Sequence, residues 1–503
     1  MLGIPFNNQY VSLGEAFYSR VMPTPVAQPT LIRWNDSLAA ELGISTTAPD
    51  EAGLAAVFAG NVVPVGAEPL AMAYAGHQFG QFVPQLGDGR AILLGEVGDA
   101  ASGRVALQLK GAGRTVYSRN GDGRAALGPV LREYLLSEAM HRLGVPTTRA
   151  LAAVATGESV VRERLFPGAI ITRVASSLVR VGTFEYFAAC GDVPSLRRLA
   201  DYVIACNYPL LQQTGNPYRA LLDAIVQGQA ALIARWMQLG FIHGVMNTDN
   251  MSVACETIDY GPCAFMDAFD PQQTFSYIDR QGRYAYDQQP LIALWNLTRL
   301  AETLLPLFVD DGDQAVQQAS DILETFRPHY EQAWLDGMRA KCGLLPNAGH
   351  EQGDRALIED LLGMMASREA DFTLTFYYLS RLHVAHDRSQ SGEHAAQEQY
   401  CRQLFGDSGA FAEWLTRWRG RLALDARNDA KRQAAMQAVN PVYIPRNHQI
   451  EAAIRAAEDR QDFSVFHALF DVLQDPYTEQ QRGEHYKQPP APHEVVQYTF
   501  CGT

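Results

Sequence analysis

A polar loop near the middle of the chain carries the side chains best suited to chemistry. It reads His243-Gly-Val-Met-Asn-Thr-Asp-Asn250, and Asp259-Tyr-Gly261 follows shortly after it. Asn250 and Asp259 offer an amide oxygen and a carboxylate, the hard ligands that Mg²⁺ accepts when it also holds phosphates. A plain turn rich in Asn and Asp is the alternative, but it does not account for the His-Gly before the run or the Asp-Tyr-Gly after it.

The spacing within this loop is similar to that of a protein-kinase catalytic loop. A kinase has His-Arg-Asp, four further residues and then Asn, with Asp-Phe-Gly downstream. His243 and Asn250 keep that spacing, and Asp259 stands where the metal-binding Asp would be. Val245, however, occupies the place of the catalytic base. The chain is therefore either a nucleotide-binding module without transfer activity or an enzyme that does different chemistry on ATP.

A lysine and a glutamate upstream of the loop form a second candidate pair. Lys110 ends a predicted strand, 105–110, and alternation along that strand puts it on the face opposite Leu107 and Leu109. Glu133 lies early in the next predicted helix, where a kinase carries the glutamate that pairs with its phosphate-binding lysine. Either residue alone is as easily a solvated surface charge. Together they favour a nucleotide site.

Two glycine-rich turns and two arginines could complete a phosphate clamp. Gly87-Asp-Gly-Arg90 and Gly121-Asp-Gly-Arg124 let backbone N–H groups approach an anion, with an Arg beside each. Neither matches a Walker motif or the kinase glycine-rich loop, and Asp-Gly also marks ordinary hairpin turns. Arg173 and Arg180 are surface charges on the simplest interpretation. In a chain this acidic, Arg90, Lys110, Arg173 and Arg180 on facing elements would hold a triphosphate efficiently.

The elements that must position these residues change in type along the chain. Strands are predicted at 91–97, 105–110 and 169–173, with a helix from Pro129 to Leu143 that ends before Gly144. Another amphipathic helix is predicted at 31–42. Beyond about residue 195 the patterns are helical. The predicted helices there are 199–211, 217–239, 290–305, 315–335 and 354–367. A short apolar strand is expected at Val253 and Ala254.

This order predicts an α+β chain with a two-lobed, protein-kinase-like fold and family-specific extensions. We expect an N-terminal extension packed on the core at 1–65 and a β-rich, nucleotide-binding N-lobe at 66–190. A helical C-lobe with the catalytic loop and metal site would span 191–475. The last segment, 476–503, is rich in Gln, Pro and His and is expected to be a loosely structured tail.

Composition excludes several classes of partner. The formal charge of −14 argues against nucleic acid or an anionic membrane as the main partner, because binding phosphates along a surface needs a basic footprint. No apolar run approaches 18 residues, and the first residues lack the pattern of a signal peptide, so a cytoplasmic enzyme is expected. The seven cysteines are scattered without a C-x-x-C pair, which favours reduced thiols.

Several longer motifs resemble those of the selenoprotein O family, a kinase-fold group of protein adenylyltransferases. The resemblance covers most of the chain. The motifs are Tyr74-Ala-Gly-His-Gln-Phe-Gly80, Gln85-Leu-Gly-Asp-Gly-Arg90, Gln108-Leu-Lys-Gly-Ala-Gly-Arg114, the loop 243–251, Phe269-Asp-Pro271 and Gly282-Arg-Tyr284. This resemblance implies transfer of AMP from ATP to Ser, Thr or Tyr hydroxyls of proteins, with ATP bound in reverse relative to ordinary kinases and pyrophosphate released.

The resemblance also implies a role for each candidate residue. The nucleotide would be lined by Gly87, Gly89, Arg90, Asp122 and Gly123, and its phosphates held by Lys110, Arg173 and Arg180. Asp259 would contact both nucleotide and metal. Asn250 and Asp259 would bind Mg²⁺ or Mn²⁺, and Glu133 would orient Lys110. Asp249 would take the proton from the attacking hydroxyl, so the base would lie four residues beyond Val245. This change of position would follow from the change of reacting atom, which is the α-phosphorus here and the γ-phosphorus in an ordinary kinase.

One feature departs from the family. Its members carry a Cys or selenocysteine near the C-terminus, which in some bacterial members pairs with a Cys after the Asp-Tyr-Gly motif. Cys501 is present here, but residues 271–280 contain no Cys, and Cys263 has a different spacing. Redox control through an internal disulfide is therefore not expected.

Two other functions are weighed against AMP transfer. Phosphotransferases of the aminoglycoside-kinase sort also begin this loop with His-Gly, but they keep an Asp where Val245 stands. A pseudokinase that binds ATP without transfer would have no need of Lys110, Glu133, Asn250 and Asp259 together. The substrates are expected to be ATP and proteins, with no nucleic acid and no membrane.

Overall fold

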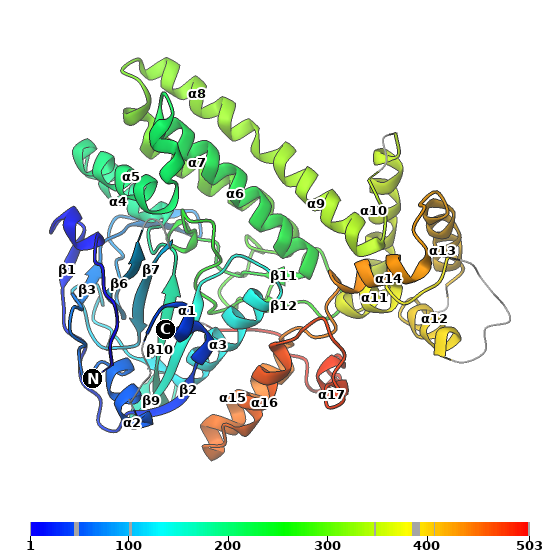
Figure 1. Cartoon of the computed structure of the whole chain (residues 1–503), viewed down its shortest axis with the longest axis horizontal. Helices are drawn as coiled ribbons and strands as arrows, with labels where there is room; N and C mark the ends of the chain where they lie inside the picture. Colours follow the sequence, from blue (N-terminus) through cyan, green and yellow to red (C-terminus); the bar gives the residue numbers. More distant parts are fainter. Residues whose placement is uncertain are drawn as a thin grey trace.

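An antiparallel sheet lies at one end of the molecule and helices make up most of the rest (Figure 1). The computed structural model describes residues 2–44, 50–99, 103–346, 349–384, 393–406 and 408–500. The sheet is built from the N-terminal part of the chain, and the helices that follow extend away from it. The predicted order of a β-rich part before a helical part is confirmed. The kinase-like fold and the four segment boundaries stay predictions.

The main sheet has the strand order β1-β3-β6-β7-β10-β9-β2, with β8 paired to β10. All of its pairings are antiparallel. Its strands are β1 (Tyr18–Arg20), β2 (Thr30–Trp34), β3 (Leu70–Met72), β6 (Ala91–Asp99), β7 (Gly103–Lys110), β8 (Ala125–Ala126), β9 (Arg149–Val161) and β10 (Leu165–Ala175). Both edge strands, β1 and β2, come from the first 34 residues, so the N-terminal segment contributes strands to the sheet.

The helix predicted at 31–42 is wrong in its first half. Residues Thr30–Trp34 form β2, which pairs with β9, and only Asp36–Glu41 is helical, as α1. The Asn35 side chain caps α1 by accepting a hydrogen bond from the Leu38 N–H. The stretch from Leu31 to Trp34 has β-branched and aromatic side chains that suit a strand once a partner is available. Long-range pairing therefore decides the conformation here.

The two faces of the sheet bury different helices. One face packs against α1 and α2 (Glu51–Phe58), and Leu107 and Leu109 of β7 belong to that core. Gln108 and Lys110 point to the opposite face, as the alternation predicts. That opposite face carries α3 (Leu127–Arg142), which contacts β9 and β10. The strand thus separates an apolar layer from a polar site.

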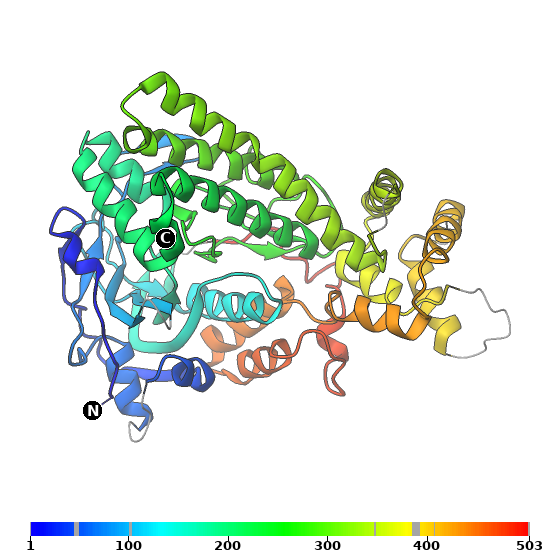
Figure 2. The ribbon, with the colours of Figure 1, turned by 45° about the horizontal axis from the view of Figure 1, so that its top comes forward.

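Helix α3 is buried on nearly all sides. The sheet lies on one side of it, and α15 (Asn447–Arg460) and α16 (Ser464–Leu473) pack against it from another (Figure 2). These two helices come from the far end of the chain. They bury the side of α3 that carries Tyr134, whose ring contacts Phe466 and Phe470.

The helical part begins after β10. Its earlier helices are α4 (Val181–Ala189), α5 (Val193–Asn207), α6 (Pro217–Leu239), α7 (Gln289–Phe308), α8 (Gly312–Glu324) and α9 (Phe326–Cys342). Those that follow before α15 are α10 (Glu351–Arg368), α11 (Phe372–Leu379), α12 (Glu393–Gln403), α13 (Gly409–Leu422) and α14 (Asp429–Gln437). A short α17 (Glu484–Lys487) precedes the C-terminal segment. Short strands β11 (Phe241–Ile242) and β12 (Ala264–Phe265) flank the polar loop.

Three local predictions in this part differ from the structure. The helix predicted at 199–211 ends at Asn207, and a separate 3-10 helix follows at Pro209–Gln213, because Pro209 has no N–H to continue the α-helical hydrogen bonding. The predicted helix 315–335 is two helices, α8 and α9, that meet at Thr325. Pro328 explains the break, because proline has no N–H to donate and is tolerated only in the first turn of a helix. Val253 and Ala254 do not form a strand, although the preceding Ser252 bridges to Arg180. By contrast, α6 covers its predicted range.

One segment of the described chain is long and apolar enough to cross a membrane by length and composition. It is Tyr286–Phe308, which comprises α7 and the turn before it. Of an apolar 18-residue stretch within this segment, 56% is buried inside the protein. Helix α7 packs against α4, α6 and α8. A core helix has these same properties, so the segment is weak evidence for a membrane span.

The C-terminal segment is more ordered than predicted. Thr499 is buried, and its backbone N–H donates to the carbonyl oxygen of Phe275 at 2.7 Å. Tyr277 packs its ring against the rings of Tyr498 and Phe500. The last described residues are therefore attached to the loop that follows the Asp-Tyr-Gly motif.

Candidate active site

A cavity of about 550 Å³ lies where the sheet meets the polar loop. The sheet and its turns contribute one wall, and the loop at 245–259 contributes the other. The structure brings together every residue predicted for this site except Glu133, which lies buried behind the wall. The predicted residues that line the cavity are Gly87, Gly89, Arg90, Lys110, Asp122, Gly123, Arg173, Arg180, Asp249, Asn250 and Asp259.

Four charged side chains form an ion-pair network, three of them in the cavity wall and Glu133 behind it. Lys110 Nζ lies 2.7 Å from Glu133 Oε2 and makes a second, shorter ion pair with Asp259 Oδ1. Arg173 reaches the same two carboxylates, with Nη2 at 2.5 Å from Glu133 Oε1 and 3.3 Å from Asp259 Oδ1. The predicted Lys110–Glu133 pair is thus one side of a four-membered network.

This network sets the charge state of both carboxylates. Burial alone would raise the pKa of Asp259, but Lys110 and Arg173 outweigh it and hold the pKa well below the usual range. The pKa of Glu133 is likewise lowered, because Arg173 and Lys110 overcome the effect of burial. Both groups therefore carry a negative charge at neutral pH. Asp259 also has φ of +68°, a left-handed conformation that turns the chain sharply at this point.

Arg180 is fixed by a residue that the sequence analysis left without a role. Its Nη2 lies 3.7 Å from Oδ1 of the buried Asp88, and its guanidinium covers the ring of Tyr74 at 4.5 Å. Asp88 Oδ2 in turn accepts a hydrogen bond from Gln108 at 3.0 Å. Asp88 lies between Gly87 and Gly89 of the first glycine turn, and its burial in a turn was the property that sequence alone could not reveal.

The glycines of this turn are required by close packing. Gly87 has φ of +68°, and a Cβ on it would lie 2.2 Å from the ring of Tyr117. A Cβ on Gly89 would lie 2.9 Å from the backbone oxygen of Tyr117. The turn is therefore pressed against residue 117, which also lines the cavity. Side chains larger than hydrogen at these positions would push the turn away from residue 117 and distort this wall of the cavity.

The second glycine turn lies at the rim. Asp122 forms an ion pair with Arg162, with Nη1 and Oδ2 at 2.8 Å, and this side-chain hydrogen bond lowers the pKa of Asp122. Gly123 has φ of +67°, and its Cβ position is filled by the backbone of Gly113. Both carboxylate oxygens of Asp122 thus already accept hydrogen bonds from Arg162.

The polar loop is held by buried contacts at its start. The His243 ring stacks on Trp236 at 5.3 Å, and its Nε2 lies 2.9 Å from the Ile258 carbonyl oxygen. Val245 is buried, and its carbonyl oxygen accepts a hydrogen bond from the Asn250 amide at 3.1 Å. Because that bond uses the Asn250 N–H group, the amide oxygen of Asn250 is the atom left for another ligand.

Asp249 directly precedes the predicted metal ligand Asn250 in the sequence, and its carboxylate is buried. It is 8% exposed, and its Oδ2 accepts a hydrogen bond from Gln78 at 3.3 Å. Its Oδ1 is buried with no hydrogen-bond partner among the described residues. Burial raises the pKa of Asp249 to about 6, while the nearby Arg180 acts in the opposite direction. A carboxylate with a pKa close to neutral is well suited to accept a proton and release it again.

The residues present fit a divalent cation held partly by a nucleotide. No group of three or more His, Cys, Asp or Glu side chains gathers at one point within the described ranges, so an all-protein cage is not seen there. Asn250 and Asp259 supply two oxygen donors at the cavity wall. Mg²⁺ is usually bound by one or two protein ligands together with substrate phosphates and water. The donor set matches that pattern.

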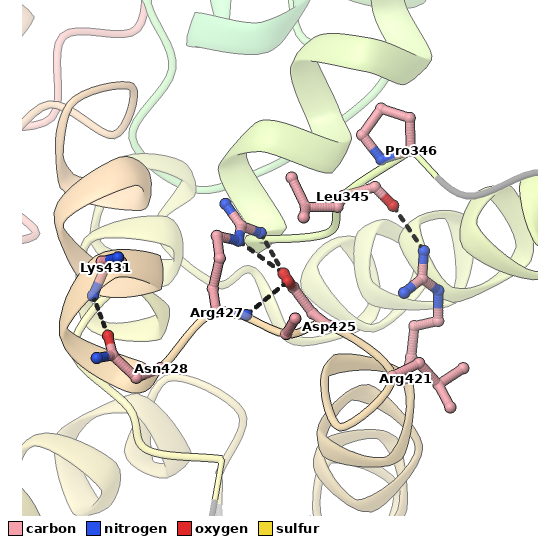
Figure 3. A pocket seen from close by; sticks show the side chains of 9 residues that line it. Leu345, Pro346, Arg421, Asp425, Arg427, Asn428 and Lys431 are labelled. Atoms are coloured by element: carbon pink, nitrogen blue, oxygen red, sulfur yellow. Dashed lines mark hydrogen bonds and ion pairs between the residues drawn. The ribbon is translucent and has the colours of Figure 1, made fainter.

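A second cavity, of about 410 Å³, lies far away among the last helices, between the end of α9 and the start of α14 (Figure 3). Arg427 pairs with Asp425, and Arg421 donates to the Leu345 carbonyl oxygen. These cations are satisfied by the protein itself. The cavity contains none of the predicted site residues.

Two cysteines considered in the sequence analysis can be placed only in part. Cys263 is buried, and its thiol donates to the Tyr260 carbonyl oxygen at 3.4 Å. Cys501 lies outside the described residues.

Comparison with known proteins finds matches over almost the whole chain. The family model described as protein adenylyltransferase SelO matches residues 1–474. The chain is 56% identical to the protein nucleotidyltransferase YdiU of Rhizobium meliloti over the full length of both. It is also 56% identical to the proteins of that name from Rhizobium johnstonii and Bradyrhizobium diazoefficiens. These matches cover 99% of this chain, and 97% and 99% of the relatives respectively.

Proposed function

The chain belongs to the protein adenylyltransferase SelO family, and on that premise we propose that the cavity at the polar loop is the site of AMP transfer. The chain is a nucleotidyltransferase that transfers AMP from ATP to proteins. The proposal concerns how its own residues carry out this reaction. It rests chiefly on one observation: Val245 presents no polar side chain to the cavity, whereas the carboxylate of Asp249 lies in the wall of the same cavity.

In the proposed reaction, an acceptor hydroxyl of Ser, Thr or Tyr attacks the α-phosphorus of ATP. A bond forms between the hydroxyl oxygen and the α-phosphorus as the bond from that phosphorus to the pyrophosphate oxygen breaks. Asp249 accepts the hydroxyl proton, and pyrophosphate leaves. Lys110, Arg173 and Arg180 stabilise the negative charge on the phosphates. Glu133 holds Lys110 and Arg173 in place.

Other residues of the cavity wall are proposed to bind the metal and the nucleotide. Asn250 and Asp259 would hold Mg²⁺ or Mn²⁺, which would supply charge neutralisation and a fixed geometry for the phosphates. Gly87, Gly89, Arg90 and Gly123, with Asp122 at the rim, would line the nucleotide. We also propose the reversed orientation of ATP that the family resemblance implies, since it presents the α-phosphorus to Asp249. A kinase-like fold and a cytoplasmic location are parts of the same proposal.

The decisive experiment uses ATP labelled on either the α- or the γ-phosphate. The protein is incubated with each nucleotide, Mg²⁺ and a mixture of acceptor proteins, and label on protein is measured. We expect label from the α-phosphate only. Transfer of γ-label would support a phosphotransferase instead. Nucleotide binding without transfer of either label would support a pseudokinase.

Three variants assign the roles. Asp259→Ala is expected to abolish transfer, because it removes a metal ligand and a partner of Lys110. Asp249→Asn keeps the shape of the side chain but removes the base, so transfer should fall by roughly 100-fold or more while ATP binding, measured by calorimetry, is retained. Asp313→Asn, on the exposed start of α8, is the matched control and should leave both unchanged. Loss of ATP binding in Asp249→Asn would contradict the assignment of Asp249 as the base.

A further inference from the structure

A small hairpin, β4 (Gly76–Gln78) and β5 (Gln81–Val83), lies against the polar loop. Its turn residues, Phe79 and Gly80, have φ of +52° and +82°, the left-handed values of a tight two-residue turn. Strand β4 contacts both the loop at 248–250 and helix α4. The hairpin has no part in the reaction as described so far.

The hairpin fixes the two loop residues that precede Asp249. The side-chain oxygen of Asn247 accepts hydrogen bonds from the Phe79 N–H at 3.1 Å and from the Tyr284 hydroxyl at 2.6 Å. Thr248 Oγ1 accepts a hydrogen bond from the His77 N–H at 2.6 Å. Backbone N–H groups of His77 and Phe79 therefore hold two consecutive residues of the loop.

Glu185 of α4 joins the hairpin to the loop from behind. One of its carboxylate oxygens lies 2.5 Å from His77 Nδ1, and the other accepts from the Thr248 hydroxyl at 2.5 Å. Glu185 is buried, so the bridge is shielded from water. The backbone of the loop at 247–248 thus has several directional anchors.

The carboxylate of Asp249 is held very differently. Among the described residues its single side-chain hydrogen bond comes from Gln78 Nε2 to Oδ2, at 3.3 Å, and Oδ1 has none. Gly76 leaves room for the carboxylate, because a Cβ there would lie 2.7 Å from Oδ1. Gln78 itself is half-buried and lines the nucleotide cavity beside Asp249. The loop is locked by many contacts, but the direction of the carboxylate depends on one.

We propose that Gln78 is a positioning residue for AMP transfer, which orients the Asp249 carboxylate toward the acceptor hydroxyl. The inference rests on the proposed function, since it assumes that Asp249 is the base. Gln78 acts through Asp249, because a neutral amide does not itself take up or release a proton in the reaction. A displacement of about 1 Å at a reacting group costs up to roughly 100-fold in rate, so the loss of a single orienting bond has a measurable effect.

The first test replaces the amide with an apolar chain of the same length, Gln78→Met. The rate of α-label transfer at saturating ATP should fall by about 10-fold or more, while KM for ATP and the melting temperature stay close to those of the wild type. Gln81→Met is the matched control. Gln81 is the cross-strand partner of Gln78 but is exposed, and it should show no change in kcat.

The second test asks whether Gln78 acts through Asp249. In an Asp249→Asn background, adding Gln78→Met should lower the residual transfer rate by less than about 2-fold, because the group that Gln78 orients no longer takes the proton. An equal loss in both backgrounds would overturn the proposal and show that Gln78 acts on substrate directly. An unchanged kcat in Gln78→Met alone would also overturn it. Failure of the proposed function is distinguishable, since the wild type and Gln81→Met would then transfer no α-label.

Discussion

At the scale of single residues, Lys341 is an unusual group in this molecule. It lies in α9 with 3% of its surface exposed, and its Nζ is 4.3 Å from the centre of the Phe376 ring. No carboxylate pairs with it among the described residues. Burial lowers the pKa of Lys341 from 10.5 to about 7. The folded protein therefore holds this side chain in its neutral form more readily than the unfolded chain does.

This shift predicts a stability effect that depends on pH. Burial of the charged amine of Lys341 lowers the free energy of unfolding, and we call this loss the stability penalty. Between pH 7 and 10.5 the unfolded state binds more protons at Lys341 than the folded state, so the penalty shrinks as pH rises. Below pH 7 the penalty is fully present. Lys341→Met should therefore raise the free energy of unfolding by about 1–3 kcal/mol at pH 7, after the loss of the cation–π contact, and by much less at pH 10.

Urea unfolding at several pH values measures this effect. Lys431→Met, at an exposed position of α14, is the control and should change little at any pH. A gain in Lys341→Met that is the same at pH 7 and pH 10 would show that apolar packing, rather than the buried charge, is responsible.

Single residues were predicted correctly from the sequence where both the residue type and its place in the order of elements matched a known pattern. The Lys110–Glu133 pair was predicted because a strand-end lysine and a helix glutamate follow a known order, and the two side chains do meet. The contacts of Asp88 and Gln78 could not be predicted in the same way. Both lie inside recognisable motifs, but their partners come from distant positions in the chain, and a turn residue gives no sign that it will be buried.

At the scale of elements, the start of α4 is packed tightly against the segment that leads into β4. The Ala75 N–H donates to the Gly182 carbonyl oxygen at 3.0 Å. A Cβ on Gly182 would lie 2.2 Å from the Ala75 carbonyl oxygen, which is backbone and cannot rotate away. The helix and the hairpin can approach this closely only because residue 182 has no side chain.

Gly182→Ala should therefore lower the free energy of unfolding by roughly 1–3 kcal/mol, the usual cost of overpacking. Thermal unfolding gives the readout. Gly363→Ala is the matched control, since Gly363 lies inside α10 with no atom within 4 Å of its Cβ position. That substitution should be neutral or stabilising by up to about 1 kcal/mol, as expected for Ala in a helix. Equal effects of the two substitutions would refute the close-contact argument.

Element boundaries were predictable where the ends carry their own signals. Helix α6 begins after Asn216, whose side chain caps it, and ends at Gly240 in a left-handed conformation. Its predicted range was correct because these signals are local. The strand β2 has no such signal, and its partner β9 lies more than a hundred residues away. Pairing of this kind cannot be deduced from local preference.

At the scale of the whole molecule, the end of the chain is joined to the site. Ser276 and Thr499 form a parallel bridge, and the Thr499 N–H donates to the Phe275 carbonyl oxygen at 2.7 Å. Ile278, two residues beyond this bridge, lines the cavity at the polar loop. The C-terminal segment therefore supports a loop that forms part of the wall of the proposed nucleotide site.

A chain that ends at Gln497 should reveal this support. It loses the bridge and the ring contacts of Tyr277, so KM for ATP should rise by about 3-fold or more, with a smaller change in kcat. Limited proteolysis should cut the loop at 275–280 faster than in the full chain. Thr499→Ser, which keeps the backbone bridge, is the control. Unchanged KM and unchanged proteolysis in the truncated chain would show that the loop stands without the tail.

The origin of the two outer strands has a consequence for how the protein is made. Residues 30–34 leave the ribosome early, but their partner strand is complete only at Val161. At about 5–20 residues per second, the segment waits on the order of ten seconds for that strand. Throughout this interval its N–H and C=O groups are open to other unfinished chains. Residues 30–34 are thus without their sheet partner until β9 has emerged, so this part of the N-terminal segment is open to aggregation during the early part of translation.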